Sequence, residues 1–116
     1  MTETELRELR PFLDERMRLK ALPARKRKKL AALWLLSERF EAGRTCSEGE
    51  VNDLLDEWTV IHDPATLRRE MFDLGLLNRT SDCRSYWKES PAENLTEFIV
   101  EFITMAVALR DLFLAV

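Results

Sequence analysis

The sequence has few of the residues that interrupt or cross-link a chain. Its 116 residues include three glycines, four prolines, two cysteines and one histidine. Low glycine and proline content argues against disorder. Two cysteines are too few for a disulfide framework and fit a reduced, cytoplasmic protein. A lone histidine without cysteines at ligand spacing offers no metal site, so we expect an ordered globular chain without a metal or other cofactor.

Strong charge of one sign and long apolar runs are also missing. The formal net charge is −3, so the chain as a whole is not a polycation. Its first residues are charged, unlike those of a secretory signal. The longest apolar run is interrupted by Glu97, Glu101, Arg110 and Asp111, so we expect no membrane span. The length of 116 residues fits a single domain. No catalytic motif stands out, so we expect that the protein is not an enzyme and has no small-molecule substrate.

Helix-start signals divide the middle of the chain. Ser47 and Glu50 form an S-x-x-E capping box, in which each side chain binds a backbone N–H at the start of a helix. Asp63 followed by Pro64 is a second start, because a carboxylate caps free N–H groups and proline needs none at the first helical position. Gly75 can take the left-handed conformation that ends this second helix. The sequence therefore predicts two helices joined by a short turn.

Short extended segments flank these two helices. A strand should begin at Thr45, and the runs Leu76–Thr80 and Ser85–Lys88 read as a two-stranded ribbon with residues 81–84 at its tip. The helices would bury apolar residues at helical spacing: Val51, Leu54 and Leu55 in the first, and Leu67, Met71 and Leu74 in the second. The order strand, helix, turn, helix, ribbon predicts a mostly α, α+β fold of the winged helix–turn–helix type.

The residues before this strand predict an N-terminal helical extension. One helix should span Thr2–Asp14 with an interruption or kink at Pro11. A second should carry Pro23 in its first turn and end near Glu41. Its apolar face would pack on the helix–turn–helix: Leu30, Leu33, Trp34 and Phe40.

A final helix should begin with Ser90 as its cap, Pro91 next and Glu93 at the third position. Its apolar residues alternate spacings of three and four, the pattern of a helical seam: Leu95, Phe98, Phe102, Met105, Leu109, Leu112 and Val116. A second set widens that seam: Ile99, Ile103, Ala106 and Phe113.

The apolar surface of this helix is larger than one small domain normally buries. We therefore divide the chain into a winged-helix domain with its N-terminal helices, residues 1–89, and a C-terminal helix that forms a homodimer, residues 90–116. The alternative is a monomer in which this helix folds back over Leu33, Trp34 and Leu36.

Basic residues are concentrated in one segment. From Arg16 to Lys29 there are eight and no acidic residue: Arg16, Arg18, Lys20, Arg25, Lys26, Arg27, Lys28 and Lys29. Cations in the first turn of a helix oppose its dipole, at roughly 0.3–1 kcal/mol for a well-placed charge, yet a helix N-terminus attracts phosphate. We predict a weak nucleic-acid contact through Arg25, Lys26, Arg27, Lys28 and Lys29, extended by Arg79 and Arg84 of the ribbon. The alternative is a solvated charged face.

The helix that would enter a DNA groove carries mixed charge. Three acids make it a poor match for a polyanion: Asp63, Glu70 and Asp73. We interpret its two arginines as structural, with Arg69 paired to Asp73 and Arg68 reaching Asp56 or Glu57. This acidity favours the alternative function, a protein-interaction or dimerisation domain without nucleic-acid contact.

For Cys46 and Cys83 we expect buried, unreactive thiols.

Short motifs between Leu9 and Lys88, in this order, resemble a bacterial family of uncharacterised domains, domain-of-unknown-function family 2087. They are Phe12-Leu13-Asp14, the run Leu22–Lys28, Phe40-Glu41, Glu48 with Glu50-Val51-Asn52, the run Thr66–Glu70, Gly75-Leu76-Leu77, and Tyr86-Trp87. Members occur alone or attached to small helix–turn–helix transcription regulators, so the resemblance implies an association with bacterial transcription.

The sequence departs from the family pattern in three places. Cys46 stands where the family tends to carry an aromatic residue. Cys83 follows Asp82 where glycine is usual, so we expect a less tight hairpin tip. The helix after Ser90 lies outside the resemblance, and its role rests on its own residues.

Overall fold

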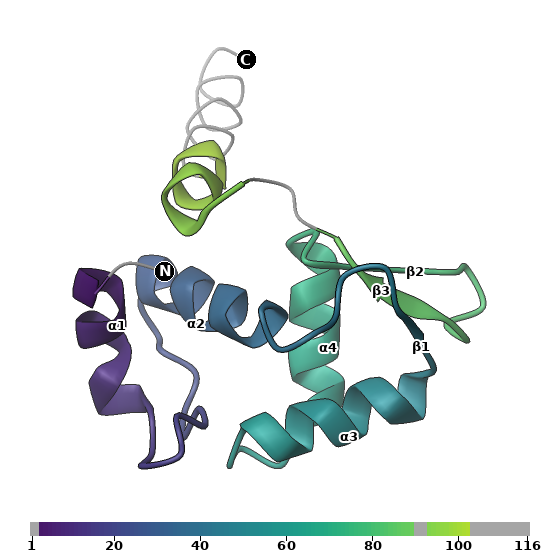
Figure 1. Cartoon of the computed structure of the whole chain (residues 1–116), viewed down its shortest axis with the longest axis horizontal. Helices are drawn as coiled ribbons and strands as arrows, with labels where there is room; N and C mark the ends of the chain where they lie inside the picture. Colours follow the sequence, from purple (N-terminus) through teal and green to yellow (C-terminus); the bar gives the residue numbers. More distant parts are fainter. Residues whose placement is uncertain (1–2, 90–92, 103–116) are drawn as a thin grey trace, which may run out of the picture.

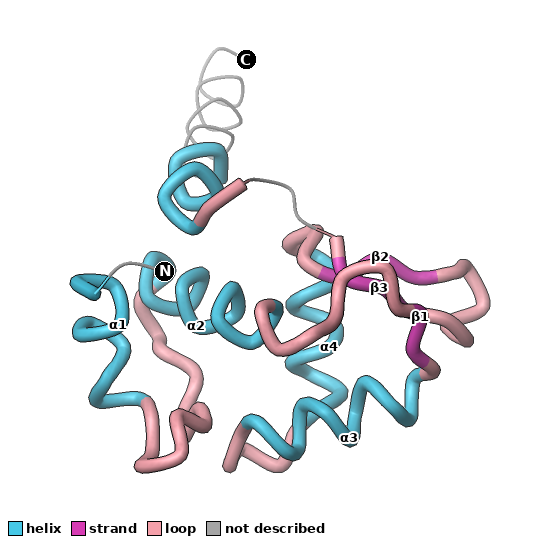
Figure 2. The backbone as a smooth tube through the Cα atoms, viewed as in Figure 1, coloured by secondary structure: helices cyan, strands magenta, loops and turns pink. Residues whose placement is uncertain are grey.

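The structure is a computed structural model that describes residues 3–89 and 93–102 (Figures 1 and 2). It is a mainly helical α+β fold with one small antiparallel sheet, as the sequence predicts. The elements are α1 (Glu3–Leu9), the 3₁₀ helix η1 (Arg10–Phe12), α2 (Lys26–Ser37), β1 (Thr45–Cys46), α3 (Glu48–Trp58), α4 (Pro64–Asp73), β2 (Leu77–Arg79) and β3 (Tyr86–Lys88). Residues 95–102 form a further helix.

The sheet joins the segment before α3 to the ribbon after α4. Its three strands lie in the order β1–β3–β2. Tyr86 of the central strand lies opposite Cys46 of β1 on one side and opposite Arg79 of β2 on the other. The short strand β1 thus becomes the third strand of the ribbon, next to α3. This topology is consistent with a winged helix, in which α3 and α4 are the helix–turn–helix and the β2–β3 hairpin is the wing.

The ends of α3 and α4 form as their cap residues predict. The Ser47 hydroxyl accepts from the Glu50 N–H, and the Glu50 carboxylate accepts from the Ser47 N–H, both at 3.1 Å. The Asp63 carboxylate accepts from the Thr66 N–H at 3.2 Å, and Gly75 takes a left-handed φ of +77°. The predicted inner residues are buried or half-buried: Val51, Leu54, Leu55, Leu67, Met71 and Leu74.

Both predicted bounds of α2 are wrong. Pro23 is buried in the preceding loop, and Arg25 still has an extended backbone (φ −71°, ψ 130°), so the helix starts at Lys26. It ends at Ser37, whose hydroxyl donates to the Trp34 carbonyl at 2.6 Å. The chain then leaves in tight turns that bury Phe40. At the N-terminus, the expected interruption is confirmed, because Pro11 lies in η1 directly after α1.

Helix α2 is buried on more sides than its sequence pattern suggests. Every residue from Leu30 to Ser37 is buried, including Ala31, Ala32 and Leu35 outside the predicted apolar face. Figure 1 shows the cause, since α2 lies between α1 and α4, and the helix of residues 95–102 packs over it. α2 is therefore the central element of the core.

An irregular segment ties the N-terminal extension to the helix–turn–helix. Leu19 is buried and forms β-bridges with both Leu13 and Thr59. Its N–H donates to the Trp58 carbonyl at 3.0 Å, and its carbonyl accepts from the Val60 N–H at 2.9 Å. The extension and the end of α3 therefore share backbone hydrogen bonds.

The last described helix starts later than the sequence predicts. Asn94, rather than Ser90, provides its cap, because the Asn94 side chain accepts from the Glu97 N–H at 2.9 Å and residues 93–94 are not helical. Ser90 and Pro91 themselves lie outside the described residues. None of the helices in the described part of the chain is long and apolar enough to cross a membrane.

Candidate nucleic-acid interface

The predicted basic segment lies where α2 begins. Arg25 precedes the helix, and Lys26 to Lys29 form its first turn, which contains no acidic residue. No side chain caps the first N–H groups of α2, whereas Ser47 and Asp63 cap those of α3 and α4. The start of α2 is therefore a cationic helix end with uncapped donors.

One member of the predicted site serves the fold instead. The Lys29 ammonium lies 2.6 Å from Oε1 of Glu70 in α4, and both side chains are only partly exposed. The second oxygen of Glu70, Oε2, is buried and has no hydrogen-bond partner among the described residues. Lys29 therefore compensates a desolvated carboxylate and ties α2 to α4. Further back in the basic segment, Arg18 is likewise paired, with Asp14 at 2.8 Å.

The other four cations at the start of α2 differ in whether their side chains contact other residues. The Lys26 ammonium lies 4.6 Å from the centre of the Phe102 ring, and the Lys28 ammonium lies 6.0 Å from that of Phe12. Arg25 and Arg27 are exposed, and neither guanidinium has an ion-pair or hydrogen-bond partner within residues 3–89 and 93–102. Arg25 and Arg27 are thus the cations most available to a phosphate.

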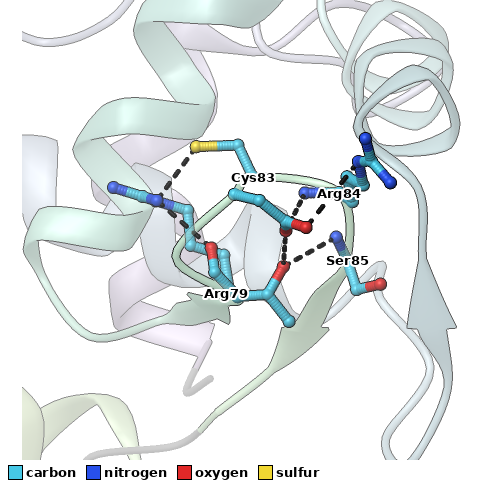
Figure 3. Close-up of polar contacts among 6 residues, drawn as sticks. Arg79, Cys83, Arg84 and Ser85 are labelled. Carbon is cyan, nitrogen blue, oxygen red and sulfur yellow. Dashed lines mark hydrogen bonds and ion pairs between the residues drawn. The ribbon is translucent and has the colours of Figure 1, made fainter.

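The two arginines of the hairpin point in different directions (Figure 3). The Arg79 guanidinium donates to Cys83 Sγ at 2.9 Å and lies 4.3 Å from the Phe72 ring centre. The Arg84 side chain is 86% exposed and lies 3.7 Å from the Asp82 carboxylate. Hydrogen bonds from the Thr80 hydroxyl and the Arg84 N–H lower the pKa of Asp82, so Asp82 stays ionised and offsets the charge of Arg84.

The fold does not bring the predicted cations together. α2 begins on the side of α1, and the β2–β3 hairpin projects from the opposite side of the molecule (Figure 1). The start of α2 and the hairpin are therefore two separate surfaces.

Arg68 is structural, as expected, but its expected partners are wrong. It reaches the first half of α3, where it donates to the Asn52 side chain and lies 3.3 Å from the Glu48 carboxylate. Asp56 and Glu57 come too late in α3 to meet it. Arg69 is exposed, and the expected pair with Asp73 is not found among the ion pairs of the described residues.

A cavity of about 580 Å³ between α4 and the hairpin was not predicted. Its lining includes Thr66, Arg69 and Phe72 of α4 and Arg79 and Cys83 of the hairpin. No local sequence signal marks it, because it exists only once the ribbon has folded back along α4. Cys83 is only half-buried there, which corrects the expectation of a buried thiol, whereas Cys46 is buried as expected.

The first residues of the predicted dimer seam are packed inside their own chain. Leu95 and Phe98 are 2% and 3% exposed, and the Phe98 ring lies 5.2 Å from that of Trp34 in α2. Phe102 is half-buried. The remaining seam residues, Met105, Leu109, Leu112 and Val116, lie outside the described residues. Fold-back over Trp34 thus occurs for the start of this helix, and dimerisation stays a prediction.

Comparison with known proteins identifies a family. The model of the family DUF2087, described as an uncharacterised protein conserved in bacteria, matches residues 18–88. That range runs from the segment before α2 to the end of β3. No curated protein and no solved structure matches the chain.

Proposed function

The chain belongs to the bacterial family DUF2087, and we propose that it is a non-enzymatic, transcription-associated module of the cytoplasm that binds nucleic acid weakly through the start of α2. Arg25 and Arg27 make the main contacts, and Lys26 and Lys28 add to them. Lys29 is left out of this site because Glu70 holds it. The link to transcription comes from the family resemblance, which implies members that occur alone or attached to small helix–turn–helix transcription regulators.

One observation supports this proposal most. Arg25 and Arg27 are exposed beside uncapped N–H groups of a 12-residue helix, and neither side chain has an ion-pair partner within the described residues. Positive charge there opposes the helix dipole and therefore costs stability. A phosphate bound at this end would remove that cost, because it interacts favourably with both the cations and the free N–H groups.

The same geometry implies weak binding. Three or four cations can contact only a few phosphates, so the slope of log K against log salt should be about −3, at about −0.9 for each phosphate neutralised. The net charge of −3 further opposes approach to a polyanion. Binding should therefore be measurable at low ionic strength and lost near physiological salt.

The test is fluorescence anisotropy with a short mixed-sequence duplex over a salt series. Wild type should bind with a salt-dependent affinity, and the double variant Arg25→Glu/Arg27→Glu should not bind. Its thermal unfolding temperature should not fall, because these side chains have no partner in the described structure and glutamate at a helix start interacts favourably with the dipole. Arg84→Glu is the matched control for the single variant Arg27→Glu, since each reverses one exposed arginine. Arg84→Glu should reduce affinity only slightly, and Arg27→Glu should reduce it strongly.

Two results would contradict the proposal. One is the absence of salt-dependent binding by the wild type at low ionic strength. The other is equal loss of binding in Arg84→Glu, which would move the contact to the hairpin or to net charge alone.

Self-association is a second candidate function, and the C-terminal segment favours it. The residues that follow Phe102 are mostly apolar in sequence and continue the spacing of the predicted seam. In this case the module would join two copies of the chain without contacting nucleic acid.

A further inference from the structure

The cavity between α4 and the β2–β3 hairpin has the size of a ligand site. Its volume of about 580 Å³ falls within the range of roughly 300–1,000 Å³ that is usual for small-molecule pockets. One wall is the outer face of α4, with Thr66, Arg69 and Phe72, and the other is the hairpin, with Arg79 and Cys83. It is separate from the start of α2.

The three arginines of this cavity differ in how many N–H groups their existing contacts leave for a ligand. Arg68 is committed to Asn52 and Glu48 of α3. Arg79 lies over Phe72 and donates from one terminal nitrogen to Cys83 Sγ and to the Thr80 carbonyl, but its other guanidinium N–H groups are not used by these contacts. Arg69 is exposed, and no acid within the described residues pairs with it. Arg69 and Arg79 are therefore the two cations of the lining with N–H groups left for an anion.

The acids of the cavity limit how much negative charge it accepts. Glu70 lines it, but the Glu70 carboxylate is already paired with Lys29 on the side facing α2. Asp73 lines it as well and is exposed. Asp73 follows Arg69 by one helical turn, so its charge opposes any anion bound there, and a ligand with one anionic group is favoured over a ligand with two.

The rest of the lining is partly apolar. Ala65, Phe72 and the Tyr86 ring contribute carbon surface. Burial raises the pKa of the Tyr86 phenol, so the ring remains neutral at physiological pH. Arginine forks match the two oxygens of a carboxylate or phosphate group. The guanidiniums of Arg79 and Arg68 lie over the rings of Phe72 and Tyr86, so a planar ring would contact the carbon surface beside these guanidiniums.

From this arrangement we infer that the α4–hairpin cavity binds a small planar-ring compound bearing one oxyanion group, with Arg69 and Arg79 donating to that group. The inference does not depend on nucleic-acid binding, because it uses neither Arg25 nor Arg27. Such a ligand would contact both α4 and the hairpin and would hold them together.

The experiment titrates ¹⁵N-labelled full-length protein with benzoate, phenyl phosphate and the neutral isostere benzamide. Benzoate or phenyl phosphate should shift amide signals of α4 and the hairpin, and the stronger of the two identifies the oxyanion. Benzamide should bind at least about tenfold more weakly, because it lacks the charge that the arginines recognise. Equal binding of benzamide, or no shift with either acid at millimolar concentration, would overturn the inference.

Two variants locate the site. Arg69→Gln should weaken the acid at least about tenfold without changing thermal unfolding, since the Arg69 side chain is exposed. Arg84→Gln is the matched control, because the Arg84 side chain points away from Arg79 and Cys83 (Figure 3) and should leave affinity unchanged. Equal weakening by both variants would contradict the assignment.

Cys83 provides an independent readout. It lines the cavity, whereas Cys46 is buried in β1. Alkylation of Cys83 by iodoacetamide, followed by mass spectrometry, should slow when the acid is bound. Full-rate alkylation at a saturating acid concentration would place the ligand elsewhere.

Discussion

Cys83 adopts a backbone conformation that suits glycine. Its φ is +61°, in the left-handed region, where a side chain costs about 1 kcal/mol because Cβ crowds the backbone. The family pattern usually has glycine after Asp82. Here the Cys83 thiol accepts a hydrogen bond from Arg79 at 2.9 Å. Cysteine at this position therefore strains the turn but adds a contact with Arg79 that glycine could not make.

We predict that Cys83→Gly is more stable than Cys83→Ala by about 1 kcal/mol. Both variants remove the thiol and its hydrogen bond to Arg79, so they differ in the strain of the turn. Urea unfolding of the two variants measures this difference. An alanine variant as stable as the glycine variant would show that the turn relaxes to a negative φ.

At the scale of elements, local signals predict the caps of α3 and α4 and the stop of α4, but not the bounds of α2, the start of the last described helix or the packing. The caps at Ser47 and Asp63 and the stop at Gly75 depend on residues within one turn of the chain, and all three form as predicted. The start of α2 fails because Pro23 suits an extended segment as well as a first helical turn. Nothing near Leu30–Ser37 in sequence indicates that three other helices cover α2.

The composition of the candidate nucleic-acid site could be predicted from the sequence, but the contacts of its side chains could not. The basic composition of Arg25–Lys29 is visible in the sequence, and so is its position at a helix start. The pairing of Lys29 with Glu70, by contrast, joins residues 41 positions apart (70 − 29) and depends on how α2 packs against α4. The α4–hairpin cavity has the same origin, because it requires the ribbon to lie along α4.

We predict that Lys29→Ala lowers stability by about 1–2 kcal/mol, because it leaves the partly buried Glu70 carboxylate without its cation. Arg27→Ala, two residues earlier in the same turn, should change stability by less than about 0.5 kcal/mol, as is usual for exposed sites. Chemical unfolding of both variants provides the comparison. If Lys29→Ala/Glu70→Ala is no more stable than Lys29→Ala, the cost does not come from the unpaired carboxylate.

At the scale of the whole molecule, the core depends on segments outside the family match. α1 precedes that range and packs on α2, and Phe98 of the last described helix follows it and contacts Trp34. The buried state of α2 is therefore completed by both flanks of the chain. This arrangement uses Leu95 and Phe98 within one molecule, so a dimer would have to rely on seam residues further along the sequence.

We predict that the chain is a homodimer at tens of micromolar and that Leu109→Asp converts it to a folded monomer. Beyond Phe102 the spacing of Met105, Leu109, Leu112 and Val116 still describes one apolar stripe, and two copies packed by two-fold symmetry would bury it. Light scattering after size exclusion measures the molar mass. Val100→Asp is the matched control, because Val100 is exposed and off the seam, so that variant should remain dimeric. A monomeric wild type would rule out the dimer, and loss of the dimer in both variants would indicate that the contact is not the predicted seam.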